Sequence, residues 1–371
     1  MVEPGNHPDS GAPYQPVPRT VNPLVKVHDL ALLEFAGPDS SRARDFFTNF
    51  GLQCSEGEAG SLLFSAEAGA PVAVIYRPAS RAKFIGPTFS VKTEKELDQL
   101  AAGTDSAPPT PQDLPGRPPG ITLTDPNGVQ VRVAYFADWR AMPSCGEVTP
   151  TNRGPDRPRT NSPRRPPRLP SRVLRLGHMV LGTPQWETTA RFYIDTLGLI
   201  PSDVQALPDG RPAVAFMRCD RGDEPTDHHT FVVARLPVVD FEHAAFEVPD
   251  LDEVGMGGAI LQEKGFRRAW GIGRHILGSQ IFDYWFGPDG YKFEHFADGD
   301  LFDSARPTGY HAMSTAGLSQ WGPSMPQAFI RPRMGPRDLW HLLRNLLSNS
   351  GFGFKELRLL GQAMRSKSLP E

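Results

Sequence analysis

The feature that most constrains the fold of this chain is an internal repeat. In each half an apolar stretch precedes a segment of helical periodicity that ends in Gly-Leu, and strand patterns joined by turns follow. The glycines stand where a helix C-cap favours positive φ. Each half therefore predicts a strand, a helix and then several further strands. The matching segments are 30–33 with 176–181, 40–50 with 184–197, 89–91 with 246–248, and 125–128 with 287–290.

Two such repeats predict an α+β fold of two tandem modules. Each module would consist of paired βαβββ units that form curved, mainly antiparallel sheets, because strands follow one another directly after the first helix. The 371 residues suffice for two domains at roughly 150 residues each. We expect a first module at residues 26–140 and a second at residues 173–302.

Three segments fall outside the repeat. Residues 1–25 are rich in Pro, Gly and polar side chains and predict a disordered or extended arm. Residues 141–172 are rich in Pro and Arg, which disfavours regular helix and central strand and predicts an interdomain linker; a functional basic patch is the alternative, but it lacks interleaved aromatic residues. Residues 303–371 predict an extension with amphipathic helices that dock on the body or on a dimer partner, with a lid or membrane-surface role as the alternative.

Composition limits the functions that this chain can serve. The net charge of −3, from 39 basic and 42 acidic residues, gives no overall field that would attract nucleic acid or an anionic membrane. No apolar run approaches the ~20 residues of a membrane span, and the first ten residues do not resemble a secretory signal. We expect a soluble, cytoplasmic homo-oligomer with no nucleic-acid or membrane partner. Three scattered cysteines argue against a disulfide framework: Cys54, Cys145 and Cys219.

Histidines gather in the second half, where six of the ten lie between residues 178 and 295. His178 and His243 each begin a strand pattern, and Glu294 ends the strand after the last turn. In a curved sheet these three strands can line one concave face. A carboxylate in the middle of an otherwise apolar strand needs a partner such as a metal or a basic group. His295 is left out of this set because strand alternation turns it to the opposite face.

The first half has no such set. Its corresponding positions are Leu32, Gly86 and Arg132, none of which could complete a metal site. A structural requirement of the fold should be met in both halves, so a set present in only one half favours function. Two imidazoles and one carboxylate form the facial triad typical of non-haem Fe(II) oxygenases, but zinc also accepts these ligands. The ligand types alone therefore do not name the metal.

A longer motif in the second half indicates more specifically which class of enzyme this chain resembles. It runs Gly273-Arg274-His275, Asp283-Tyr284, Gly287-Pro288-Asp289-Gly290 and Glu294. On this motif the second half resembles the type I extradiol ring-cleaving dioxygenases of the vicinal oxygen chelate superfamily, and the likeness is strong for residues 174–298. Two positions depart from the family pattern: an apolar residue is usual at Asp283, and an acidic, amide or small side chain at Gly287.

The resemblance implies an oxidoreductase similar to catechol 2,3-dioxygenase. Such an enzyme uses O2 to cleave the ring of a catecholic or polyhydroxylated aromatic, as in aromatic catabolism. The resemblance implies a mononuclear Fe(II), with Mn(II) as the alternative, bound by His178, His243 and Glu294. Two other functions stay open: a metal-dependent glyoxalase-like lyase or isomerase, and a non-enzymatic protein that binds small molecules.

The resemblance also implies catalytic side chains beside the metal. His275 and Tyr284 would hold the hydroxyl oxygens of the substrate. A histidine about 15 residues before the second metal ligand would stabilise charge that develops on oxygen and would exchange protons. That count selects His228, with the adjacent His229 as the alternative.

Overall fold

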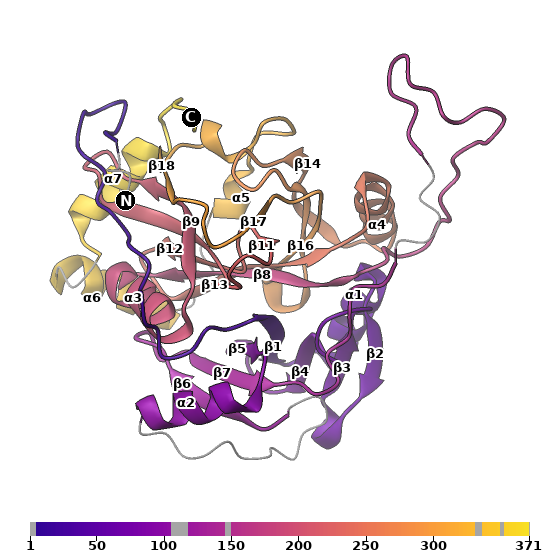
Figure 1. Ribbon diagram of the computed structural model, residues 1–371, viewed down its shortest axis with the longest axis horizontal. Helices are drawn as coiled ribbons and strands as arrows, with labels where there is room; N and C mark the ends of the chain where they lie inside the picture. The colour runs from indigo at the N-terminus through magenta and orange to yellow at the C-terminus, as the bar shows by residue number, and fades with distance from the viewer. Residues whose placement is uncertain (1–4, 105–117, 145–149, 331–335, 349–351, 371) are drawn as a thin grey trace.

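Two curved β-sheets, one from each repeat, form the framework of the structure (Figure 1). The computed structural model describes residues 5–104, 118–144, 150–330, 336–348 and 352–370. Most neighbouring strands are antiparallel, and only a few helices accompany them. The predicted α+β class is therefore confirmed.

The first sheet has seven strands in the order β2-β3-β4-β1-β5-β7-β6. Its helices are α1 (Ser40–Phe50) and α2 (Glu94–Thr104). Its strands are β1 (Asp29–Gly37), β2 (Gln53–Glu56), β3 (Leu62–Ser65), β4 (Val74–Pro78), β5 (Lys83–Val91), β6 (Gly120–Thr124) and β7 (Gln130–Tyr135).

The second sheet has nine strands in the order β14-β15-β16-β13-β8-β12-β10-β9-β18. Its helices are α3 (Trp186–Leu197) and α4 (Leu251–Glu263). Its strands are β8 (Arg175–Thr183), β9 (Ile200–Ala206), β10 (Pro212–Arg218), β12 (Phe231–Arg235), β13 (Asp240–Glu247), β14 (Arg267–Arg274), β15 (Ile281–Phe286), β16 (Lys292–Ala297) and β18 (Gly309–Ala312). The short strands β11 (Thr226–Asp227) and β17 (Leu301–Phe302) pair with each other.

The repeat extends to the pairing of individual residues. In the first sheet Thr88 of β5 pairs with Arg132 of β7, and in the second sheet Ala245 of β13 pairs with Glu294 of β16. Both pairs are parallel and join equivalent strands. The first helix of each repeat ends at a left-handed glycine, Gly51 or Gly198, as the sequence predicted.

The two modules share one hydrophobic core. Phe46 and Phe47 of α1 contact Phe293 of the second sheet, with ring centroids 5.5 and 4.9 Å apart. In return, Tyr193 of α3 faces Phe89 of the first sheet at 6.3 Å. Each helix thus buries aromatic side chains between its own sheet and the other module, which fixes the two sheets relative to each other.

The N-terminal arm lies along the second module past α3 before it enters β1 (Figure 1). The backbone N–H of Gln15 donates to the carbonyl of Gly210, and Val17 is buried. Residues 150–171 form a long loop beside α4, where Arg164 pairs with Asp250 at 2.5 Å. Among the described residues, no helix is both long and apolar enough to cross a membrane.

The C-terminal extension contributes to the second module. Strand β18, where the sequence pattern of the repeat had already ended, pairs in parallel with β9. Three helices follow: α5 (Gln327–Ile330), α6 (Pro336–Ser348) and α7 (Phe354–Ala363). Helix α7 packs through Ala363 against Leu207 and Ala213. Cys54 and Cys219 are free thiols, and Cys145 lies outside the described residues.

Candidate metal centre

Three neighbouring strands at the middle of the second sheet bring the predicted ligands together. His178 lies on β8, His243 on β13 and Glu294 on β16. One ligand atom from each lies within 4.8 Å of the others. Nε2 of His178 is 3.4 Å, and Nε2 of His243 is 3.5 Å, from the same carboxylate oxygen of Glu294. The arrangement can converge on a single ion.

The Glu294 carboxylate carries the evidence that a cation belongs here. It is fully buried, and within the described part of the chain neither of its oxygens accepts a hydrogen bond. Burial raises the pKa of Glu294, although the imidazoles of His243 and His275 oppose the rise. A buried carboxylate without hydrogen bonds is costly. A metal ion between it and the two imidazoles would remove that cost, so these residues fit a metal.

The His178 imidazole is in the form that binds metal. Burial lowers the pKa of His178 well below its ordinary value, and the neighbouring His243 lowers it further. A neutral imidazole has a lone pair for a metal ion, whereas an imidazolium does not. The carboxylate would then be the only charged ligand of the set.

Glu242 supports His243 from behind. The register of β13 shifts between Phe241 and His243, so Glu242 bulges from the strand and its carboxylate contacts Nδ1 of His243. Lys292 contacts the other oxygen of the same carboxylate. Burial would raise the pKa of Glu242, but Lys292 and His243 lower it to about 2. The carboxylate therefore holds Nδ1–H of His243 and leaves Nε2 for a metal.

The predicted His275 and Tyr284 also lie at this centre. Nε2 of His275 is 2.9 Å from the Tyr284 hydroxyl and 4.0 Å from a Glu294 oxygen. Nδ1 of His275 is 2.7 Å from the carbonyl oxygen of Leu318, which lies in the C-terminal extension. Since a carbonyl only accepts, His275 carries its proton on Nδ1. Nothing in the sequence pattern indicated that Leu318 would orient this ring.

Of the two adjacent histidines, His229 is the one that contacts a metal ligand. Its ring centroid is 4.1 Å from that of His178. His228 lies behind it and bonds instead to His229 and to Asp203. The structure thus differs from the spacing count, which selected His228. A residue count cannot separate two adjacent histidines, whereas packing decides which ring contacts His178.

An apolar wall flanks the centre beside Tyr284. Its members come partly from β14 and β15 and partly from the extension, and Phe329 lies 4.9 Å from the Tyr284 ring, measured between centroids. Lys292 donates to the carbonyl of Phe329 at 2.8 Å, which ties the wall to the Glu242 pair. The main members are Trp270, Phe282, Leu318, Met325 and Phe329.

The corresponding positions of the first module cannot bind a metal. Leu32 is fully buried in an apolar cluster, and the buried Arg132 donates to the carbonyl of Pro118. Gly86 has φ +158°, and a Cβ there would lie 1.8 Å from the carbonyl oxygen of Gln130. Among the described residues, His178, His243 and Glu294 form the one group with metal-binding geometry.

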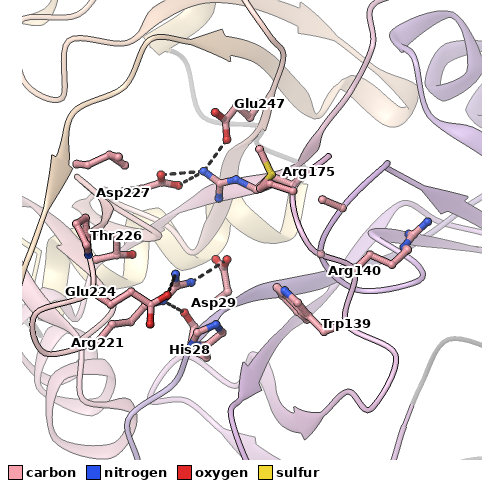
Figure 2. Close-up of a pocket in the computed structure, with 15 residues that line it drawn as sticks. His28, Asp29, Trp139, Arg140, Arg175, Arg221, Glu224, Thr226, Asp227 and Glu247 are labelled. Carbon is pink, nitrogen blue, oxygen red and sulfur yellow. Dashed lines mark hydrogen bonds and ion pairs between the residues drawn. The ribbon is translucent and has the colours of Figure 1, made fainter. Parts of the chain in front are cut away.

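A separate cavity of about 370 Å³ lies where the two modules meet (Figure 2). Asp29 begins β1 and Arg175 begins β8, so equivalent positions of the repeat carry opposite charges here. Arg175 pairs with Asp227 at 2.7 Å and with Glu247 at 2.6 Å, while Asp29 pairs with Arg221 at 3.1 Å. The Asp29–Arg221 pair joins the two modules, whereas both Arg175 pairs lie within the second module. None of the metal-centre residues lines the cavity.

Comparisons with known proteins agree with this architecture. Residues 175–295 match the model of the Glyoxalase/Bleomycin resistance protein/Dioxygenase superfamily. A metapyrocatechase 2 of Cupriavidus necator is 36% identical over 42% of this chain and 47% of its own length. An iron-dependent extradiol dioxygenase of Rhodococcus jostii (strain RHA1) is 28% identical over 40% of this chain and 50% of its own length. The chain spans about half the length of the curated relatives it matches.

Solved structures share the fold over most of the chain. The Mn(II)-bound glyoxalase from Novosphingobium aromaticivorans superposes with a TM-score of 0.68 at 20% identity, over 84% of this chain and 97% of that one. Homoprotocatechuate 2,3-dioxygenase from Arthrobacter globiformis superposes with a TM-score of 0.67 at 18% identity, over 86% and 95%. At these identities the likeness shows the fold alone. Together with the sequence match, it identifies residues 175–295 as a domain of the Glyoxalase/Bleomycin resistance protein/Dioxygenase superfamily.

Proposed function

We propose that this chain is an extradiol dioxygenase that cleaves the ring of a catecholic or polyhydroxylated aromatic with O2. The observation that carries the proposal is the buried Glu294 carboxylate, which accepts no hydrogen bond from the described residues and faces the imidazoles of His178 and His243. Sequence relatives of this module include a metapyrocatechase and an iron-dependent extradiol dioxygenase, which supports the reaction class.

We infer that His178, His243 and Glu294 hold Fe(II), with Mn(II) as the alternative. Two imidazoles and one carboxylate suit either ion. When bound, the metal would supply open coordination positions at which both hydroxyl oxygens of a catechol and O2 can be activated.

His229 is our assignment for the acid–base group, in place of His228. Burial lowers the pKa of His229 well below its ordinary value, and the neighbouring His178 and His228 lower it further. The ring is therefore neutral at neutral pH and can accept a proton from a catechol hydroxyl. Its contact with the ring of His178 supports this assignment, because a group beside a metal ligand would lie near the oxygens of a metal-bound catechol.

His275 and Tyr284 would orient the substrate. Burial raises the pKa of Tyr284 well above its ordinary value, so its hydroxyl keeps its proton and can donate a hydrogen bond. Leu318 fixes the ring of His275, which in turn faces the Tyr284 hydroxyl. The apolar wall that includes Phe329 would flank an aromatic ring and exclude water from it.

A glyoxalase-like lyase is the second candidate, because the Mn(II)-bound glyoxalase shares the fold. Against it, the first module offers no ligand at Leu32, Gly86 or Arg132, so a site built from both modules is not available. Cytoplasmic location, a homo-oligomeric state and the lack of a nucleic-acid partner stay predictions from the sequence.

Oxygen uptake tests the proposal. Anaerobically purified, Fe(II)-loaded protein would be mixed with a panel of catechols and trihydroxybenzenes, while absorbance follows the ring-opened product. We expect one O2 consumed per product formed with at least one diol, and neither signal from Glu294→Ala or from Zn(II)-loaded protein. If no diol causes uptake although metal is bound stoichiometrically, the extradiol assignment is wrong.

A further inference from the structure

A chain of hydrogen bonds leads from the metal centre into the C-terminal extension. Nδ1 of His229 is 2.8 Å from Nδ1 of His228. Nε2 of His228 is 2.6 Å from one oxygen of Asp203 on β9, and Nε2 of His311 on β18 is 2.8 Å from the other oxygen. Four polar side chains thus form one line that begins beside His178.

All four groups are removed from water. His228, His229 and Asp203 are buried, and the side chain of His311 is 10% exposed. Burial would raise the pKa of Asp203, but hydrogen bonds from His228 and His311 lower it to about 2. Asp203 is therefore a carboxylate at neutral pH and can only accept hydrogen bonds.

This charge determines the direction of each hydrogen bond. Because the Asp203 carboxylate only accepts, His228 donates to it from Nε2. If His228 carries a single proton, its donation from Nε2 leaves Nδ1 as an acceptor. His229 must then donate from its own Nδ1, which leaves the lone pair on Nε2. The tautomer of His229 follows from a carboxylate two side chains away.

We propose that Asp203, acting through His228, is a positioning residue that holds His229 in the Nδ1–H tautomer, with Nε2 free to accept the proton of a substrate hydroxyl. His311 holds the second oxygen of Asp203 and so connects β18 to the metal centre. The catalytic part of this inference rests on the proposed function, whereas the tautomer does not. A general base needs its lone pair on the atom that faces the reacting group.

The tautomer can be measured directly. The full chain, loaded with Zn(II) as a diamagnetic ion and labelled with 15N-histidine, would be studied by long-range 1H–15N correlation, with the His229 signals assigned by their loss in His229→Gln. We expect Nδ1–H at His229 in the unchanged chain. Asp203→Leu and His228→Phe should each release it to a mixture of tautomers or to Nε2–H.

Tyr310→Phe is the matched control. It removes a half-buried hydroxyl from the same strand as His311, where the backbone N–H of Val17 donates to it, but it leaves the four-residue chain intact. We expect this variant to keep the Nδ1–H tautomer. An Nε2–H tautomer in the unchanged chain, or an unchanged tautomer in both Asp203→Leu and His228→Phe, would overturn the inference.

Steady-state kinetics provide a second test of the inference. In Fe(II)-loaded protein, Asp203→Leu should lower kcat about 100-fold or more, with KM for the catechol nearly unchanged, because only proton transfer is impaired. A loss that appears mainly in KM, or an equal loss in Tyr310→Phe, would show a structural role and overturn the inference. If the unchanged chain cleaves no diol, the proposed function fails, and the tautomer measurement still decides this inference.

Discussion

At the scale of residues, the chemistry of the centre depends on which polar groups bond to its imidazoles. The Glu242 carboxylate contacts Nδ1 of His243 because a bulge in β13 brings the two neighbours to the same side of the strand. The backbone carbonyl of Leu318 accepts a hydrogen bond from Nδ1 of His275, and Nδ1 of His228 bonds to Nδ1 of His229. Of these three rings only His243 is a candidate metal ligand, and the contact at its Nδ1 leaves Nε2 for the metal.

Glu242→Gln should weaken metal binding. The amide keeps the shape of the side chain but removes the charge that holds the His243 ring and balances Lys292. We expect the affinity for Fe(II) to fall about 10- to 100-fold, as competition with a coloured chelator would measure. Glu247→Gln, which removes a charge from the same strand at the module joint, should leave the affinity unchanged. An equal loss in both variants would contradict this role of Glu242.

Asp283, where the family usually has an apolar residue, should make stability depend on pH. Burial raises its pKa to about 7, although Arg268 and the Trp285 indole N–H oppose the rise. Between the ordinary carboxyl pKa and about 7, the folded state keeps a proton that the unfolded state releases, so stability falls as pH rises through this range. Urea unfolding of Asp283→Asn should show a larger gain over the unchanged chain at pH 8 than at pH 5. The same difference at both pH values would contradict the raised pKa.

At the scale of elements, the local sequence pattern predicts the helix ends and the repeat, and the strand register of the repeat predicts where the candidate metal ligands lie. The helix ends at Gly51 and Gly198 and the repeat itself follow from local pattern, and the structure confirms the α+β fold. The positions of His178, His243 and Glu294 follow from the repeat because equivalent strands pair with equivalent register. This much of the site could be predicted from the sequence.

Other features depend on packing that no local pattern encodes. The bulge at Glu242 breaks strand alternation, so its contact with His243 cannot be counted from the sequence. The choice of His229 over His228 depends on which ring packs on His178. Leu318 and His311 come from beyond the repeat, in an extension whose docking is decided by tertiary contacts.

Leu32→Ala should destabilise the fold without affecting the metal. Leu32 is fully buried on β1, at the position that His178 has on β8. Loss of its buried side chain should lower the free energy of unfolding by about 2–5 kcal/mol, as urea titration would measure. Metal content should remain that of the unchanged chain. Loss of metal from folded Leu32→Ala protein would count against a centre confined to the second module.

At the scale of the whole molecule, parts outside the repeat complete the second module. Strand β18 extends its sheet, and the segment with Leu318 and Phe329 covers the metal centre. The arm crosses the same module, where Arg19 of the arm and Lys26 just after it both pair with Asp220. The first module contributes packing and a charged joint in place of ligands.

Phe329→Ala should therefore weaken substrate binding more than metal binding. The change removes a ring that packs on Tyr284 and Trp270, but it keeps the backbone carbonyl that Lys292 binds. We expect KM for the catechol to rise about tenfold or more from the lost apolar contact, with metal affinity unchanged. Phe354→Ala, at an exposed position of α7, should leave KM unchanged. Equal KM values in Phe329→Ala and the unchanged chain would show that the extension does not line the substrate site.

The measurement that tests the central claim most directly is metal content after loading with Fe(II) and removal of excess ion under anaerobic conditions. The claim is one metal per chain, held by His178, His243 and Glu294. We predict one equivalent in the unchanged chain and in Leu32→Ala, and none in Glu294→Ala that is folded by circular dichroism. Metal retained by Glu294→Ala at full stoichiometry would contradict the account.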